Sequence, residues 1–204
     1  MFFPANTADY EKGDTTNYAV DGDGFISFTE CFRYLGSTIH YSLTSTADVD
    51  SRIESAAKAF GALSRDVFKN RNVSKETKGT IFLTLVLSML LYGSEYWSMT
   101  NAIMAKLTSF YRRCVRTMCR ITIRHTIKHR IKTTDLLDQL NIHPIKTYYE
   151  KRLLRWAGHV ARMDTYRLPR KLLTAWVPHP RHNGGQKMTW GKTLNKALIN
   201  NNIT

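Results

Sequence analysis

The second half of this sequence contains very few carboxylates. After residue 100 the only acidic residues are Asp135, Asp138, Glu150 and Asp164. Enzymes that use two metal ions need several carboxylates around one point, so this half cannot supply such a site. The motifs of serine hydrolases, P-loop nucleotide-binding proteins and zinc metalloproteases are absent as well. We therefore expect no catalytic residues and no activity from this chain alone.

Cysteines and long hydrophobic segments are also scarce. Three cysteines (Cys31, Cys114 and Cys119) are too few for a disulfide framework, and a chain of 204 residues can bury a core without one. The longest apolar run, Ile81–Tyr92, is shorter than the roughly 20 residues of a membrane span. The N-terminus lacks the pattern of a signal peptide. We expect an intracellular protein that does not cross a membrane, in either the nucleus or the cytoplasm.

Positive charge is abundant and lies mainly in one part of the chain. The sequence has 30 Lys and Arg against 16 Asp and Glu, a net charge of +14. Residues 1–60 have a net charge of −5, whereas residues 101–163 carry fourteen basic and three acidic residues, a net charge of +11. This concentration indicates a polyanionic partner. The alternative is a solvated basic surface that only maintains solubility.

The residue pattern divides the chain into four segments. These are a strand-and-turn segment at 1–46, a helical segment at 47–132, a basic helical segment at 133–165 and a loop-rich basic tail at 166–204. In the first segment, Phe25–Phe28 and Cys31–Leu35 are rich in β-forming residues, and we expect them to pair as a small hairpin or as a pair of edge strands. The fold class is therefore mainly α with a small N-terminal β-hairpin.

Apolar residues recur at helical spacing through most of the chain. The expected helices are Val49–Val67, Ser74–Tyr92, Thr100–Ile121, Asp135–Leu140, Pro144–Met163 and Trp190–Leu198. The second is apolar on most sides and should be the central buried helix. On the fifth, Tyr149 and Trp156 fall on the apolar stripe, so with Tyr148 they suit a core better than a stacking surface for bases.

Basic residues alternate with the apolar stripes of two of these helices. Their spacing places them on the opposite side of each helix, where they can neutralise the phosphates of a nucleic acid. The candidate contacts are Lys106, Arg112, Arg113, Arg116, Arg120, Arg124, Lys151, Arg152, Arg155, His159 and Arg162. Some of these could instead pair with carboxylates elsewhere in the fold.

Two patterns resemble metal sites. Residues 19–30 carry Asp21, Asp23 and Glu30 at the spacing of an EF-hand calcium loop, but Ala19 replaces the first ligand. A calcium-binding module is therefore an alternative function, and a hairpin turn is the other interpretation. The string Cys114, Cys119, His125 and His129 suggests zinc, but two cysteines five residues apart on one helix face different directions. We expect no metal in this chain.

Four segments occur in an order that matches a known family. They are FRYLGSTI (Phe32–Ile39), DSRIESAAKAF (Asp50–Phe60), LLYGSEYW (Leu90–Trp97) and RLLRWAGHVARM (Arg152–Met163), and NGGQKMTW (Asn183–Trp190) follows them. These segments resemble the end of the palm, the thumb and the C-terminal region of LINE-type (non-LTR) retrotransposon reverse transcriptases. The resemblance covers nearly the whole chain.

The resemblance implies a fragment of an RNA-directed DNA polymerase. Phe32, Tyr34, Leu35 and Gly36 would form the element that positions the primer end, and a thumb-like helical bundle would hold the backbone of an RNA/DNA template–primer duplex. The metal-binding aspartates of the family precede the Tyr-Leu-Gly element, so magnesium would belong to a missing palm. The expected partners are that duplex and the palm and fingers of a parent polyprotein. A nonfunctional relic of a retroelement is the other interpretation.

Overall fold

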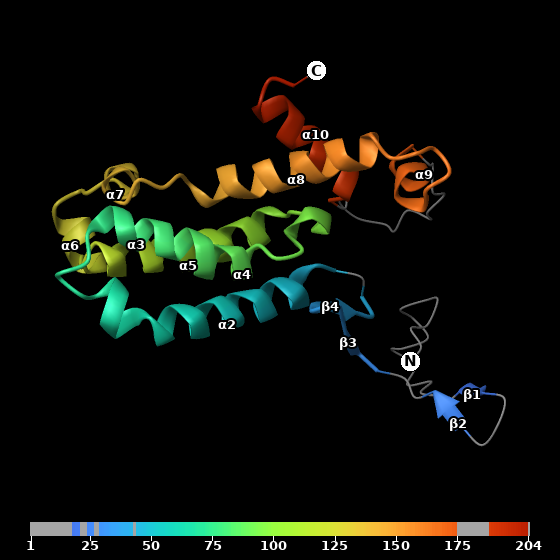
Figure 1. Cartoon of the computed structure of the whole chain (residues 1–204), viewed down its shortest axis with the longest axis horizontal. Helices are drawn as coiled ribbons and strands as arrows, with labels where there is room; N and C mark the ends of the chain where they lie inside the picture. The colour runs from blue at the N-terminus through green and yellow to red at the C-terminus, as the bar shows by residue number, and fades with distance from the viewer. Residues whose placement is uncertain (1–17, 21–23, 27–28, 43, 175–187, 204) are drawn as a thin grey trace. The chain divides into compact units, whose positions relative to one another are not determined.

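The computed structural model describes residues 18–20, 24–26, 29–42, 44–174 and 188–203 (Figure 1). The chain forms two compact units, residues 1–52 and residues 53–204. The fold is mainly helical with antiparallel β-hairpins near the N-terminus, as the sequence predicts. Within the described ranges, no helix is long and apolar enough to cross a membrane.

The first unit contains two separate two-stranded antiparallel sheets. Strand β1 (Tyr18–Val20) pairs with β2 (Gly24–Ile26), and β3 (Cys31–Tyr34) pairs with β4 (Ser37–His40). The predicted pairing of residues 25–28 with residues 31–35 is therefore wrong. Each strand pairs with its neighbour in sequence, and a short connection costs less chain entropy to close than a longer one.

The turn between β3 and β4 explains this pairing. Tyr34 faces Ser37 in the register, so the loop consists of Leu35 and Gly36 alone. Both residues have positive φ angles, 47° and 86°, as in the two-residue turns whose twist matches that of paired strands. Glycine adopts this conformation readily, whereas leucine does so at a cost.

Helix α2 (Thr46–Ala62) follows the second hairpin and continues into a π-helical turn, η1 (Ser64–Phe68). The predicted apolar stripe holds for α2, where Val49 and Ala56 are fully buried. In η1 the buried residue is Phe68 rather than the predicted Val67, which is only half-buried. A π-helical turn has one extra residue per turn, so the buried face moves by one position.

A nearly continuous helical segment comes next. It consists of α3 (Lys75–Ile81), the π-helical η2 (Phe82–Leu87) and α4 (Ser88–Leu90), and a short 3₁₀ turn, η3 (Ser94–Tyr96), follows. Ser74 caps its start by accepting the N–H of Thr77 at 3.1 Å. The prediction that this helical segment is buried on most sides is wrong for part of its surface, because Leu85 and Met89 are 49% and 42% exposed.

Three helices follow in sequence. They are α5 (Asn101–Met118), α6 (Ile123–Lys128) and α7 (Thr133–Gln139). The predicted helix through Ile121 ends earlier, because Arg120 has a φ angle of 59° and closes α5. The N–H of Arg120 bonds the Thr117 carbonyl and that of Ile121 bonds the Arg116 carbonyl, at 3.0 and 2.9 Å, which is a Schellman motif.

The C-terminal part adds three more helices. Helix α8 (Ile145–Ala161) begins after Pro144, α9 (Leu168–Thr174) was not predicted, and α10 (Trp190–Asn200) agrees with the expected last helix. Helices α3, α4, α5 and α8 run alongside one another, and α10 packs on α8 (Figure 1). Their shared core contains Phe82, Leu90, Leu107, Tyr111 and Leu153, all nearly or fully buried.

Candidate nucleic-acid interface

Helix α5 presents a cationic surface because its sequence is strongly amphipathic. Thr100 caps its N-terminus by accepting the N–H of Ile103 at 3.2 Å. Its buried residues are Ile103, Leu107, Phe110, Tyr111, Cys114, Val115 and Met118. Helical geometry places Lys106, Arg112, Arg113 and Arg116 on the other side. All of these are exposed except Arg116, which is half-buried.

No carboxylate is available to neutralise this surface locally. Residues 96–134 contain nine Lys and Arg but no Asp or Glu. Within the described ranges, Arg112, Arg113, Arg116, Arg120 and Arg124 form no ion pair. Arg112 and Arg116 are one turn apart, and like charges at this spacing destabilise a helix by about 0.2–0.5 kcal/mol. An external anion would remove this repulsion.

One arginine of α5 has an aromatic neighbour. The guanidinium carbon of Arg113 lies 5.4 Å from the centre of the Phe110 ring, which is within the range of a cation–π interaction. This contact orients the side chain along the helix surface. Because an aromatic ring does not cancel the charge, Arg113 can still meet a phosphate.

The cationic surface continues beyond α5 into a part that the sequence reasoning omitted. Arg120 and Arg124 were predicted contacts, and both are exposed. The exposed residues Lys128, Arg130 and Lys132 follow them in α6 and in the turn before α7. The sequence could have indicated these three residues, because they belong to the same stretch without carboxylates. They were missed because they lie outside the two long helices with alternating basic and apolar residues.

Helix α8 carries the second predicted set, and its members differ in environment. Lys151, Arg155, His159 and Arg162 are exposed. Arg152 is half-buried and binds other parts of the protein: its guanidinium donates to the Leu91 carbonyl oxygen at 3.3 Å and lies 3.5 Å from a Glu95 carboxylate oxygen. The structure thus distinguishes Arg152 from the other cations of this helix.

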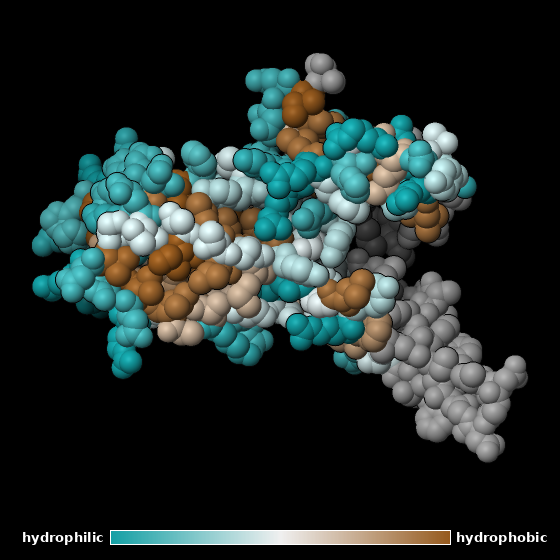
Figure 2. Space-filling view, in the orientation of Figure 1, coloured by the Kyte–Doolittle hydropathy of each residue, from teal (hydrophilic) through white to brown (hydrophobic). Residues whose placement is uncertain are grey.

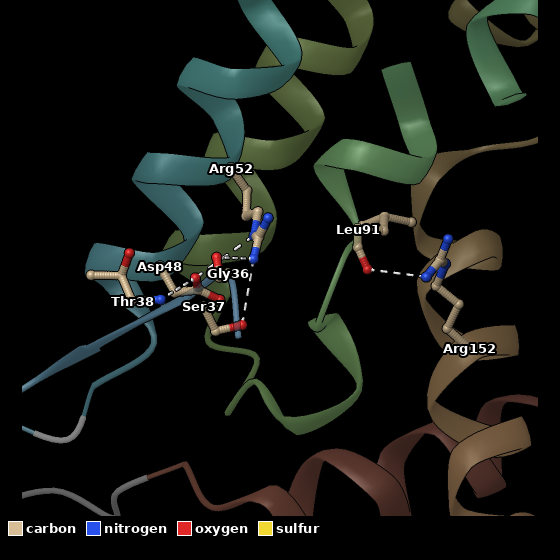
Figure 3. Close-up of polar contacts among 7 residues, drawn as sticks. All are labelled: Gly36, Ser37, Thr38, Asp48, Arg52, Leu91 and Arg152. Carbon is tan, nitrogen blue, oxygen red and sulfur yellow. Dashed lines mark hydrogen bonds and ion pairs between the residues drawn. The ribbon is translucent and has the colours of Figure 1, made fainter. Parts of the chain in front are cut away.

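Arg152 belongs to a set of bonds that fix residues 91–99 (Figure 3). The Tyr149 hydroxyl donates to the Trp97 carbonyl at 3.5 Å, and the indole N–H of Trp190 donates to the Glu95 carbonyl at 2.6 Å. The Thr193 hydroxyl accepts the N–H of Met99 at 3.2 Å. Helices α8 and α10 therefore hold a segment that includes most of the LLYGSEYW sequence.

The predicted primer-end element forms the tip of the β3–β4 hairpin. Tyr34 and Leu35 are 57% and 76% exposed, whereas Phe32 and Gly36 are half-buried. The rings of Phe32 and Tyr34 are 6.3 Å apart. The structure therefore presents two large apolar side chains to the surface at a two-residue turn.

The start of α2 holds this hairpin in place (Figure 3). An Asp48 carboxylate oxygen accepts the N–H of Thr38 at 2.8 Å. The Arg52 guanidinium donates to the Gly36 carbonyl and, at 3.4 Å, to the Ser37 hydroxyl. Sequence reasoning missed this clamp, although an Asp and an Arg four residues apart in the first turns of a helix were a visible signal.

Aromatic residues of α8 divide between the core and a shallow cavity. Tyr149 is 2% exposed, and burial raises the pKa of its hydroxyl well above the ordinary value. Trp156 is half-buried and lines a cavity of about 260 Å³ together with Tyr96, Leu172 and Trp190. The expectation that these residues serve the core holds for Tyr149 and only in part for Trp156.

The metal-like patterns do not assemble in the described part of the chain. There, no group of three or more His, Cys, Asp and Glu side chains is arranged to hold a metal ion. Asp21 and Asp23 lie outside the described residues, and Glu30 is exposed. The strands β1 and β2 pair antiparallel, in agreement with a hairpin rather than with the helix–loop–helix of an EF-hand.

The two cysteines of the second metal-like pattern are buried, whereas its two histidines are exposed. Cys114 and Cys119 are buried, and burial raises the pKa of the Cys114 thiol to about 12. A thiol must lose its proton to bind zinc, so this environment opposes coordination. His125 and His129 are exposed and lie against each other, with ring centres 4.2 Å apart.

Comparison with known proteins identifies a distant relative. A transposon-derived protein of Caenorhabditis elegans is 26% identical over 169 residues, which cover 82% of this chain. The chain spans 60% of the length of that relative. No family model and no solved structure matches the chain. The chain is thus a distant homologue of a transposon-derived protein.

Proposed function

We propose that this chain binds the backbone of an RNA/DNA template–primer duplex, as the thumb and C-terminal part of a LINE-type reverse transcriptase, and does not polymerise alone. The observation that carries the proposal is the exposed side of α5, where four of the predicted contacts share one helix with no carboxylate. The four sequence segments that resemble that family and the homology to a transposon-derived protein agree with it.

The chemistry of the surface favours recognition of shape and charge. Arginine side chains on a helix can follow a row of phosphates, and these contacts contain little information about sequence. An RNA/DNA hybrid has a wide and shallow minor groove flanked by two such rows. We therefore expect binding to depend steeply on salt and weakly on base sequence.

Fluorescence anisotropy with a labelled RNA/DNA duplex tests this proposal. If six to ten cations neutralise phosphates, affinity should fall by about 10³–10⁵-fold between 50 and 200 mM salt. The test variant is Arg112→Gln/Arg116→Gln/Arg155→Gln, which should reduce the slope of log affinity against log salt by about 2–3. A folded protein that does not bind at 50 mM salt would contradict the proposal.

A matched variant controls for net charge. Lys58 on α2, Arg65 on η1 and Lys69 directly after η1 are exposed residues outside the proposed surface, and the first two already pair with Glu54 and Asp66. The variant Lys58→Gln/Arg65→Gln/Lys69→Gln also removes three charges. It should keep most of the affinity and most of the slope if α5 and α8 hold the contacts.

A second candidate is a fragment that works only when docked on the palm and fingers of a parent polyprotein, or a relic that has lost them. Exposed apolar residues favour it: Leu85, Met89, Tyr92 and Tyr96 recur at helical spacing and are 42–54% exposed. Figure 2 shows hydrophobic residues on the face formed by α3 and its neighbours. Strong binding of a hydrophobic dye with weak near-UV dichroism would support this candidate.

A further inference from the structure

Lys78 on α3 is a buried lysine whose ammonium has no partner. The residue is 3% exposed, and it forms no side-chain hydrogen bond or ion pair with any residue that the structure describes. Its nitrogen is nevertheless not fully enclosed by the protein. The aliphatic stem is therefore buried, and the charged end reaches the edge of the packed region.

The surroundings of this ammonium are cationic. Lys75 lies one turn earlier on α3, and Arg120 follows the C-terminus of α5. Burial lowers the pKa of Lys78, and the charge of Arg120 lowers it further; Cys119 acts in the opposite direction, and Lys75 adds a smaller decrease. The nearby Cys119 thiol is also buried, which raises its pKa and keeps it neutral.

Local structure holds these groups together. Gly79 packs against the backbone of Leu140, since a Cβ at Gly79 would lie 2.1 Å from that carbonyl oxygen. The Lys75 ammonium donates to the side-chain oxygen of Gln139 on α7 at 2.7 Å. The Schellman motif at the end of α5 places Arg120 in the left-handed conformation. The ends of α3, α5 and α7 thus meet at one end of the bundle (Figure 1).

No carboxylate in the described part of the chain forms an ion pair with this cluster. The partner of Lys75 is a neutral amide, and neither Arg120 nor Lys78 forms an ion pair within the described ranges. Figure 2 shows hydrophilic residues gathered at the end of the bundle that α6 and α7 form. Neighbouring cations without an anion repel one another, so an anion that binds among them would relieve this repulsion.

We propose that Lys78, Arg120 and Lys75 form a phosphate-binding site and that it takes one backbone phosphate of the nucleic acid. The claim that the bound phosphate belongs to a nucleic acid rests on the function proposed above, whereas the affinity for phosphate itself does not. A bound phosphate would accept hydrogen bonds from the ammonium and guanidinium groups and relieve their repulsion. The partly buried lysine would give this contact a fixed position, unlike the mobile arginines on the surface of α5.

Thermal unfolding at pH 7 tests the site without any nucleic acid. The protein is heated in sodium phosphate and in sodium chloride of equal ionic strength, with Lys78→Met as the test variant and Lys58→Met as the control. Phosphate should raise the midpoint of the original protein and of the control more than that of Lys78→Met. In chloride, Lys78→Met should be as stable as the original protein or more so, because methionine keeps the stem and removes the unpaired charge. An equal response to phosphate in all three proteins would overturn the site.

A second variant covers the case in which Lys78→Met does not fold. Arg120→Gly removes a charge of the same cluster, and glycine suits the positive φ angle of that position. This variant should fold at least as well as the original protein and should lose most of the response to phosphate. A full response would contradict the proposal.

Binding to the duplex then distinguishes the sources of phosphate. Loss of one contact should reduce the salt slope by about 0.9 in Lys78→Met and leave it unchanged in Lys58→Met. If the original protein binds with a steep slope and Lys78→Met has the same slope, the site does not contact the nucleic acid and this inference fails, while the proposed function stands. If the original protein does not bind the duplex, the proposed function fails and the thermal experiment alone decides whether phosphate binds at Lys78.

Discussion

The guanidinium of Arg52 donates a hydrogen bond to the carbonyl oxygen of Gly36, which lies sixteen positions earlier in the chain. The same side chain pairs with Asp48 at 3.7 Å, and Asp48 in turn accepts the N–H of Thr38. Both charged residues are buried, with exposed fractions of 9% and 4%. One ion pair at the start of α2 therefore anchors the turn and strand β4 of the hairpin that the sequence resemblance associates with the primer end.

Replacing Arg52 should loosen this hairpin. Arg52→Met removes the bond to Gly36 and leaves the buried Asp48 carboxylate without its cation, and hydrogen bonds to charged groups contribute about 1.5–3 kcal/mol each. We expect the backbone amide of Thr38 to exchange its hydrogen about 10- to 100-fold faster, measured by NMR. Lys58→Met, which breaks the exposed pair with Glu54, should leave that rate unchanged. An unchanged rate in Arg52→Met would show that the clamp does not hold the turn.

Two glycines in helices should respond in opposite ways to alanine. A Cβ at Gly79 would lie 2.1 Å from the Leu140 carbonyl oxygen, whereas a Cβ at Gly61 in α2 has no atom within 4 Å. Gly79→Ala must move the backbone and should cost about 3 kcal/mol or more. Gly61→Ala should stabilise the protein by about 0.5–1 kcal/mol, because alanine favours a helix. Urea denaturation measures both, and equal effects would contradict the packing of α3 on Leu140.

Arg152 and Arg155 are both basic residues of α8 but should have different roles. Arg152→Gln loses the bond to Leu91 and the pair with Glu95, so it should lower the free energy of unfolding by about 1–3 kcal/mol. Arg155 is exposed, so Arg155→Gln should change stability by less than about 0.5 kcal/mol and reduce the salt slope of duplex binding by about 0.9. The reverse result would mean that the structural assignment of these two residues is wrong.

The three cysteines should react at very different rates. Cys31 is exposed, whereas Cys114 and Cys119 are buried, and burial raises the pKa of both buried thiols. At pH 8 a thiol reagent should modify one cysteine of the folded protein within minutes and the other two only after denaturant is added. Mass spectrometry after timed quenching identifies the sites. Early modification of Cys114 would contradict its place in the core.

Stability should decline at alkaline pH. The pKa of Cys114 rises from 9.0 in the unfolded chain to about 12 in the folded protein, so the folded state favours the neutral thiol. This contribution to stability is fully present below pH 9 and disappears as the pH rises from 9 toward 12. Burial acts in the same direction on the Tyr111 hydroxyl, which donates to the His143 carbonyl at 2.5 Å. Urea midpoints between pH 8 and 11 test this, and Cys114→Val should show a shallower decline.

Much of the helical layout could be read from local patterns. The Ser74 and Thr100 caps, the apolar stripe of α5 and the break at Asn141 are properties of neighbouring residues, so the sequence contains them directly. The predicted buried positions were wrong where a change in helix type shifted the helical register. The π-helical turns at Ser64–Phe68 and Phe82–Leu87 move the buried face, and residue spacing alone does not reveal them.

The sequence by itself determined the chemistry of the candidate interface, namely its stretch without carboxylates and its two basic helices. Only the tertiary structure decided the role of each cation, because that role depends on neighbours far away in the chain. Arg152 meets Leu91 and Arg52 meets Gly36, so both charges serve the fold. Lys78 lies within electrostatic range of Arg120 and has no ion pair among the described residues, and only the packing of α3 near α5 and α7 could bring those charges together.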